Sequence, residues 1–232
     1  ELHTLRFAGS EYVEFHQMTI TTGYTEKNEI VQIADLASNN RLFGNRILAN
    51  ARSQTGIGGL PFAENRIDWN TLMGGSKGIH LEGTDFMTWT NDSTHFTRLT
   101  GNTLYQQADT AIAIKNYICP VIRENSIYAS DSSIVGIYLE ENNQTPLLAN
   151  SIRLLNGGTG IYLDPYYGHD YNLLANNEVV FHTEQPDAAI ELISTGTTDK
   201  FDVMHNTLNV TGNHASSYCI RSNTDHSGIR IR

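Results

Sequence analysis

The segment from Tyr162 to Asn172, YLDPYYGHDYN, holds the densest group of chemically capable side chains in this sequence. Carboxylates, an imidazole and several phenol rings follow one another around a proline and a glycine, which favour a turn. Carboxylates and imidazoles transfer protons, and tyrosine rings stack on the apolar faces of sugar rings. The candidates in this segment are Asp164, Tyr166, Tyr167, His169 and Asp170.

Similar residue types recur at fixed places in short alternating sequences such as GIHLE (78–82), AIAIK (111–115) and GIYLE (136–140). Successive side chains of a strand point to opposite sides, so the Ile and Leu residues point inward and the residues between them point outward. If the strands lie side by side, the outward residues form two columns. One contains His80, Ala113, Tyr138, Tyr162 and Glu191, and the other contains Glu82, Lys115, Glu140 and Asp164.

These columns predict a surface on which two stacked tyrosines lie beside acids and a lysine. Such carboxylates can bind sugar hydroxyls or Ca²⁺, and a lysine or acid with a shifted pKa can act as a general base. An ordinary solvated sheet face is the alternative. The candidate catalytic residues are Lys115, Glu140, Asp164 and His169. The candidate substrate-binding residues are His80, Glu82, Tyr138, Tyr162, Tyr166, Tyr167, Asp170 and Glu191. No cofactor is required, and Ca²⁺ at Glu140 and Asp164 is the candidate metal.

The elements that must position these residues repeat along the chain. An asparagine between two apolar residues recurs every 23 to 32 residues, each time after a short alternating strand. A unit of this length cannot bury its own apolar face, but stacked units can. Identical amides in successive coils about 4.8 Å apart would bond to one another, and Asn tolerates the left-handed backbone of sharp turns. The recurrent residues are Asn45, Asn70, Asn102, Asn125, Asn150, Asn176 and Asn206, with Gln17 as a candidate first copy.

Over essentially its whole length the pattern resembles the right-handed parallel β-helix repeats of pectate-lyase-like proteins. The resemblance implies an all-β, single-stranded, right-handed parallel β-helix solenoid of about eight to nine coils, with residues 1–232 forming one domain. This fold hosts lyases, hydrolases, epimerases, adhesins and phage spikes, so it does not decide function.

One dipeptide, Asp164-Pro165, is similar to the Asp-Pro-His segment of mannuronan C5-epimerases. Tyr166 stands where that segment has its catalytic histidine, and His169 lies three residues further on. The acid–base role that the resemblance implies therefore lacks its histidine in register.

Composition excludes several classes of function. A net charge of −10 without a visible Lys/Arg cluster argues against nucleic acid. No run of 18 apolar residues is present, which predicts no membrane span. The nine histidines show no zinc-ligand spacing.

The start at Glu1 and the end in SGIRIR favour a segment of a larger extracellular or cell-surface protein. Uncapped coil ends would then meet flanking domains or a second copy, because open strand edges favour stacking.

The two cysteines test the repeat. Cys119 and Cys219 should lie four coils apart, or roughly 19 Å along the axis at the strand spacing. A disulfide requires Cα atoms within about 7 Å, so the sequence predicts two free, mostly buried thiols.

Three functions follow from the sequence. The leading one is an extracellular β-helix domain that engages polysaccharide through its sheet face and turn loops, with weak or no catalysis. The second is a polysaccharide lyase or uronate C5-epimerase that uses the candidate catalytic residues. The third is a structural adhesin stalk or filament subunit.

Overall fold

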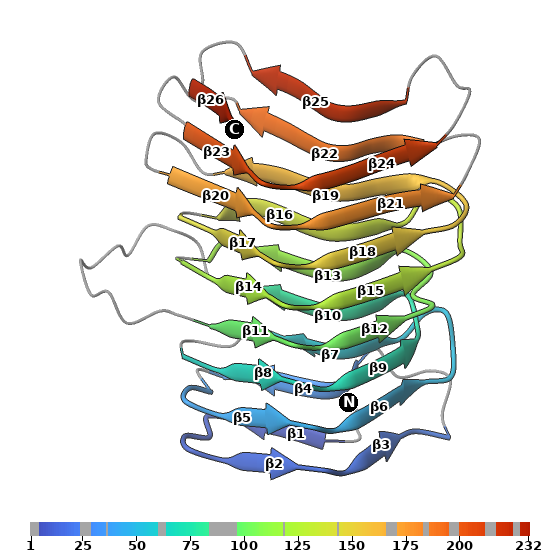
Figure 1. The fold of residues 1–232 in the computed structure, drawn as a ribbon. Helices are drawn as coiled ribbons and strands as arrows, with labels where there is room; N and C mark the ends of the chain where they lie inside the picture. Colours follow the sequence, from blue (N-terminus) through green and yellow to red (C-terminus); the bar gives the residue numbers. More distant parts are fainter. Residues whose placement is uncertain are drawn as a thin grey trace.

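The computed structural model describes residues 5–23, 29–35, 37–59, 64–83, 97–117, 119–142, 144–165, 171–182, 186–194, 200–211, 217–224 and 228–232. These residues form strands and no helix. Each coil of the chain passes in turn through three parallel sheets (Figure 1). The coils rise from the blue end to the red end in a right-handed sense, so the expected right-handed parallel β-helix is confirmed.

The three sheets contain nine, nine and eight strands. The first sheet consists of β1 (Leu5–Ala8), β4 (Glu29–Ala34), β7 (Thr55–Gly59), β10 (Lys77–Glu82), β13 (Thr110–Lys115), β16 (Val135–Asn142), β19 (Gly158–Pro165), β22 (Pro186–Ser194) and β25 (Tyr218–Thr224). The second consists of β2 (Glu14–His16), β5 (Arg41–Phe43), β8 (Arg66–Asp68), β11 (Arg98–Thr100), β14 (Val121–Arg123), β17 (Pro146–Leu148), β20 (Tyr171–Ala175), β23 (Lys200–Met204) and β26 (Gly228–Ile231). The third consists of β3 (Thr19–Thr21), β6 (Arg46–Ala49), β9 (Thr71–Gly74), β12 (Thr103–Tyr105), β15 (Ser126–Ala129), β18 (Ser151–Leu154), β21 (Glu178–His182) and β24 (Thr207–Thr211).

The core lies between the three sheets. The inward residues of the first sheet, which the alternating sequences predicted, are fully buried: Ile79, Leu81, Ile112, Ile114, Ile137, Leu139, Ile161, Leu163, Ile190 and Leu192. The glycine of each GIYL sequence packs closely against a side chain of the third sheet, Ile152 for Gly136 and Val179 for Gly160. A Cβ on Gly160 would lie 2.4 Å from Val179 Cγ1 and 2.5 Å from the Ala189 carbonyl oxygen. Glycine is therefore required there by close packing.

Seven asparagines occupy equivalent corners between the second and third sheets and form one row of hydrogen bonds. In each pair the Nδ2 group donates to Oδ1 of the asparagine in the next coil, at 2.9–3.1 Å. Each Nδ2 also donates to a backbone carbonyl of the preceding coil, as Asn102 does to Ile67 at 2.7 Å. The members of this asparagine row are Asn45, Asn70, Asn102, Asn125, Asn150, Asn177 and Asn206.

Two of the predicted positions were wrong by one residue. Asn177, and not Asn176, belongs to the asparagine row. In the first coil Met18 takes the place predicted for Gln17, because its backbone N–H donates to Asn45 Oδ1 at 3.0 Å. The left-handed backbone falls on the residue before the row, with φ of 57° at Asn176 and 53° at Gln17. One residue therefore adopts the left-handed turn, and the residue after it occupies the position in the row.

Both cysteines are free, as predicted. The burial prediction was wrong, since Cys119 is only partly buried and Cys219 is exposed. Cys219 lies on β25 in the first sheet, where its side chain does not enter the core. In the described part of the chain no helix is present that could cross a membrane.

Candidate functional site

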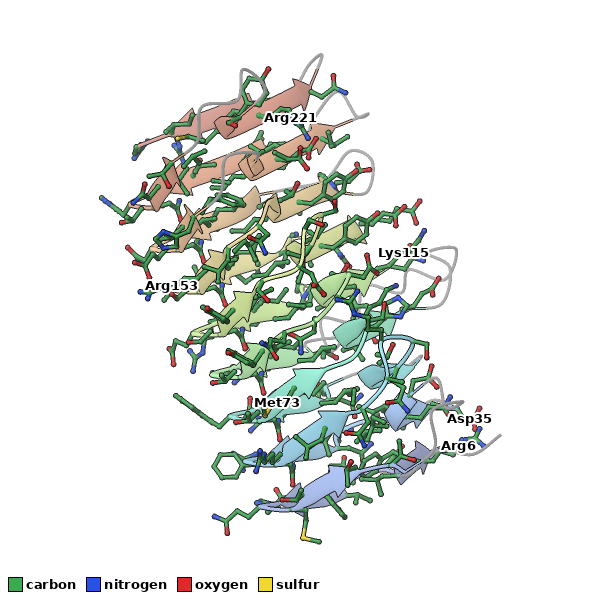
Figure 2. All side chains as sticks on the ribbon, turned by 90° about the vertical axis from the view of Figure 1, so that its right-hand side faces the viewer. Arg6, Asp35, Met73, Lys115, Arg153 and Arg221 are labelled. Carbon is green, nitrogen blue, oxygen red and sulfur yellow. The ribbon has the colours of Figure 1, made fainter. Side chains whose placement is uncertain are left out.

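The pairing of the strands brings the two predicted columns together. Residues 80, 113, 138, 162 and 191 are in register across β10, β13, β16, β19 and β22. The second column, Glu82, Lys115, Glu140 and Asp164, is in register over the first four of these strands. Both columns lie on the outer face of the first sheet, where Figure 2 shows Lys115 on the side opposite Met73 and Arg153.

The centre of this face is a connected set of four side chains. The rings of Tyr138 and Tyr162 stack with centroids 4.8 Å apart and planes 7° apart. The Tyr138 hydroxyl donates to Glu140 Oε2 at 3.1 Å, and Lys115 Nζ lies 3.2 Å from Glu140 Oε1. Glu141 adds a second carboxylate 3.6 Å from Lys115 Nζ. The tyrosine platform is thereby tied to the charged column beside it.

Beside Tyr138 the face is hollowed. Ala113 is the one small residue of its column between His80 and Tyr138, so two larger side chains flank a methyl group. A cavity of about 340 Å³ opens there. It is lined by Lys77, His80, Asp109, Thr110, Ala113, Ile114, Lys115, Val135, Tyr138 and Glu140. We call this cavity the Ala113 hollow.

Burial, hydrogen bonding and nearby charges shift the pKa values of three groups that line the hollow. The hydrogen bond from Lys115 to Glu140 raises the pKa of the lysine ammonium above its usual value. Burial raises the pKa of the Tyr138 phenol well above its ordinary range, and Glu140 adds to this effect. Burial lowers the pKa of His80, and the nearby Lys77 lowers it further. At neutral pH the hollow therefore presents an ammonium, a neutral phenol and a neutral imidazole.

The remaining predicted residues lie apart from the hollow. Glu191 holds Arg221 through two hydrogen bonds of 2.9 and 2.6 Å, so its carboxylate is already engaged. Tyr162 contributes the second ring of the stack, while Glu82 and Asp164 continue the charged column on either side. Four candidates, Tyr166, Tyr167, His169 and Asp170, lie outside the described residues.

Sequence reasoning missed three polar residues of the hollow. Lys77 begins β10 and Asp109 precedes β13, and both line the cavity. Their signal was weak because each lies at or just before the first residue of its strand, ahead of the alternating residues. Thr110, in register with Lys77, was missed for the same reason.

A further correction concerns basic residues. The sequence showed no Lys/Arg cluster, but the structure builds one on the second sheet from Arg41, Arg66 and Arg98. These arginines are 25 and 32 residues apart in the sequence, and only the stacking of coils brings them together.

These features define the chain as a parallel β-helix protein with a polar, aromatic-bearing sheet face. A family model described as "Periplasmic copper-binding protein (NosD)" matches residues 52–218, and the chain belongs to this family. The sequence predicted an extracellular or cell-surface location, and the family's description as periplasmic is consistent with the coarser statement of an extracellular or cell-envelope location. No curated protein and no solved structure matches the chain.

The family's description raises the question of copper. Copper is held in proteins by imidazole, thiolate and thioether groups. Among the described residues no group of three or more His, Cys, Asp or Glu side chains converges on one point. The two cysteines lie four coils apart, and the sulfur of Met73 faces the guanidinium of Arg46 at 3.7 Å. The described residues therefore do not fit a copper ion.

The candidate Ca²⁺ ligands Glu140 and Asp164 are in register on neighbouring strands. The cation that Glu140 contacts in this structure is the ammonium of Lys115. A Ca²⁺ ion normally takes six to eight oxygen ligands, and Ca²⁺ binding here stays a prediction.

Proposed function

We propose that this chain is a β-helix domain of the cell envelope or extracellular space that binds polysaccharide at the Ala113 hollow. The observation that carries the proposal is the geometry of Tyr138. One face of its ring is stacked on Tyr162, and the other face is turned toward the coil of Ala113. An apolar ring face thus borders a cavity with polar walls, which is a common design for a small-molecule site.

The dimensions support a single ring as the occupant. His80 and Tyr138 lie two coils apart, or about 10 Å along the axis at the usual strand spacing. Ring centroids that stack on an aromatic side chain lie about 4.5–7 Å from it, so one sugar ring fits between the two side chains above Ala113.

The walls supply hydrogen-bonding groups of both signs. Lys77 and Lys115 are donors, while Asp109 and Glu140 are acceptors. Sugar hydroxyls donate and accept, so a mixed rim suits them better than a rim of one charge would. Because the two lysines are balanced by two acids, a neutral or weakly acidic glycan is the preferred partner.

We propose binding without catalysis because of the state of Lys115. A general base must be deprotonated at the working pH. The ion pair with Glu140 raises the pKa of Lys115, which opposes that role. The lyase or epimerase hypothesis therefore has no support from this lysine.

The test is glycan binding with a matched control. Affinity gels containing alginate, pectate, chondroitin or neutral polysaccharides should retard the unchanged chain with at least one glycan. Tyr138→Ala should abolish the retardation. Tyr128→Ala is the control, because Tyr105 and Tyr128 form an equivalent stack on the third sheet with centroids 5.0 Å apart. That stack lies between Met73 and Arg153, with no small residue beside it.

Each alternative gives a different result. Ultraviolet absorbance from an unsaturated product, lost in Lys115→Ala, would favour a lyase over the proposal. Absence of retardation by every glycan, together with concentration-dependent polymerisation, would favour a structural stalk. Equal losses in Tyr138→Ala and Tyr128→Ala would show that the hollow is not the site.

A further inference from the structure

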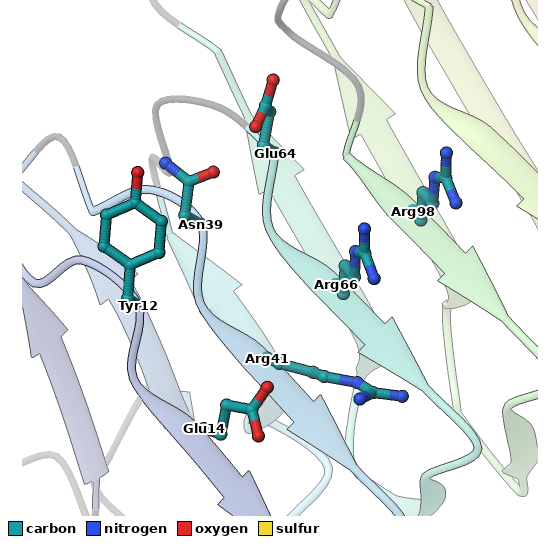
Figure 3. Close-up of a pocket in the computed structure, with 7 residues that line it drawn as sticks. All are labelled: Tyr12, Glu14, Asn39, Arg41, Glu64, Arg66 and Arg98. Atoms are coloured by element: carbon teal, nitrogen blue, oxygen red, sulfur yellow. The ribbon is translucent and has the colours of Figure 1, made fainter.

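The second sheet carries a column of three arginines that the proposed function does not use. Arg41, Arg66 and Arg98 begin β5, β8 and β11, and each is in register with the next. Strands in register lie about 4.8 Å apart, and like charges directly opposite on neighbouring strands are destabilising. Figure 3 shows the three side chains projecting from three neighbouring strands on the same side. We call these residues the arginine column.

Three acids lie near this column: Asp68, Glu14, which is in register with Arg41, and Glu64, which lines the same cavity. Asp68 is the nearest, with its Oδ2 atom 3.6 Å from Arg41 Nε and 12% of its side chain exposed. Arg41, Arg66, Arg98 and Arg123 all act electrostatically on this one carboxylate. In the described part of the chain Arg66 and Arg98 form no ion pair, and both side chains are exposed.

Arg41 is held differently from the other two. Its guanidinium lies over the ring of Phe43, 4.6 Å from the centroid, and its Nε atom is buried without a hydrogen-bond acceptor. A buried N–H donor without an acceptor lowers the free energy of unfolding, and such donors are rare in native structures. The Arg41 side chain is thereby fixed at one end of the column, with its Nε atom in an ion pair with Asp68 but in no hydrogen bond.

The column borders a cavity of about 330 Å³. The other lining residues are Tyr12, Glu14, Asn39 and Glu64 (Figure 3). The carboxylate of Glu14 accepts a hydrogen bond from His16 at 2.9 Å. Tyr12, Asn39 and Glu64 stand at equivalent corners with φ of 59°, 55° and 52°, which places one polar side chain per coil at the rim. The cavity is open to solvent beside two guanidinium groups that have no ion pair.

We propose that the arginine column binds an oxyanion, a carboxylate or phosphate group, held between Arg66 and Arg98 with Arg41 at the end of the site. Guanidinium groups bind both kinds of oxyanion through paired N–H donors in a planar fork. At the strand spacing, two adjacent guanidinium groups can donate to different oxygens of one oxyanion. A bound anion also reduces the electrostatic repulsion between the arginine side chains of the column.

The arginine column lies on the second sheet and the Ala113 hollow on the first, so this site is independent of the proposed function. The oxyanion can be a free ion or an acid group of an acidic glycan. Inorganic phosphate and trigalacturonate serve as the probes for these two sources.

Isothermal titration should show binding of at least one probe to the unchanged chain, weakened by added salt because ion pairs at an open site are screened. Arg66→Gln and Arg98→Gln should each weaken that binding about tenfold or more, since hydrogen bonds to charged groups are among the stronger ones. Arg153→Gln is the control, because it removes the same charge from the third sheet (Figure 2).

Thermal unfolding supplies the second readout. Without a probe, Arg66→Gln should unfold at the same temperature as the unchanged chain or higher, because one repulsive neighbour is removed. The probe should raise the unfolding temperature of the unchanged chain and not that of Arg66→Gln. Tighter binding of trigalacturonate would identify an acidic chain as the source, and tighter binding of phosphate a free ion. The proposal is overturned if neither probe binds, or if Arg66→Gln binds as tightly as Arg153→Gln does.

Discussion

Tyr138 is stacked on Tyr162 on one face and stands in register with Ala113 on the other. The pairing of a large ring with a methyl group on the neighbouring strand opens the face of the first sheet at this point. From Tyr138 onward the same column continues with larger residues, Tyr162 and then Glu191.

Filling the hollow should weaken glycan binding without unfolding the protein. Ala113→Leu adds bulk to an outward position between His80 and Tyr138, so it occupies the space proposed for the sugar ring. We expect a loss of affinity of about tenfold or more, comparable with a steric block of a small pocket. Ala113→Ser, which keeps the side chain small, should bind as the unchanged chain does. Retention of binding in Ala113→Leu by affinity gel would contradict the proposed site.

Removing one member of the asparagine row should destabilise the whole solenoid. Asn102→Ala removes the donor to the Ile67 carbonyl and the acceptor of the backbone N–H of Asn70. Asn125 Oδ1 loses one of its two donors and keeps the backbone N–H of residue 102. We expect a loss of on the order of 3 kcal/mol in the free energy of unfolding, because unsatisfied buried polar groups are costly.

Urea unfolding would measure that loss against a matched variant. Asn209→Ala removes the same side chain from an exposed position on β24 and should change stability little. Equal midpoints for the two variants would show that the row contributes nothing beyond an ordinary surface amide.

A methyl group on Gly160 should also be costly. It would meet Val179 Cγ1 and the Ala189 carbonyl oxygen at distances that real Cβ atoms do not adopt, so the third sheet must move outward. We expect Gly160→Ala to lose about 1–3 kcal/mol, the usual range for overpacking a core. Gly23→Ala has no neighbour within 4 Å and is the control. Thermal unfolding of the two variants separates them, and no difference would refute the close packing.

His80 should make stability depend on pH. Burial lowers its pKa below 6.5 in the folded chain, so the unfolded chain takes up the proton first as the pH falls. The free energy of unfolding should therefore decrease as the pH falls through about 6.5. His80→Gln should show a shallower decrease between pH 7.5 and pH 5 in urea unfolding. Parallel curves for the two proteins would exclude a contribution from this imidazole.

The two thiols should react separately. Cys219 is exposed, whereas Cys119 is partly buried and lies 3.4 Å from Gln144 Oε1. A thiol reagent applied to the folded protein should modify Cys219 first and Cys119 more slowly. Cys219→Ser should remove the fast phase only. An intramolecular disulfide under mild oxidation would contradict the four-coil separation of these residues.

The sequence predicted the columns of the first sheet because two signals agreed. Alternation separates Ile137 and Leu139 from Tyr138, and the repeated GIYL sequence aligns one coil with the next. A one-residue error in such a register would have exchanged the core and surface faces, so the pattern is strongly constrained.

The asparagine row was less constrained. Asn176 and Asn177 are both asparagines but differ in structure: Asn176 has the left-handed backbone of the turn, and Asn177 belongs to the row. No pattern of residue types separates them, and only the hydrogen bonds to Asn150 and Asn206 do so.

The arginine column was missed for a related reason. Arg66 and Arg98 begin short strands, and their 32-residue separation in the sequence does not show that they are in register on paired strands. Local sequence shows neither charge density nor alternation there. The four candidates between residues 166 and 170 stay predictions, because they lie outside the described residues.

The asparagine row also restricts how the length of such a protein can change. The spacing from Asn70 to Asn102 is 32 residues and that from Asn102 to Asn125 is 23. The Nδ2–Oδ1 hydrogen bonds between these pairs nevertheless have nearly the same length, 3.1 and 3.0 Å. Extra residues within a coil are therefore accommodated outside the row. Each coil contributes one asparagine to the row, whatever the length of the coil. Duplication or deletion of one unit would leave every remaining amide with the same kind of partner. Evolution can thus lengthen or shorten this solenoid in steps of one coil and can vary its corners independently.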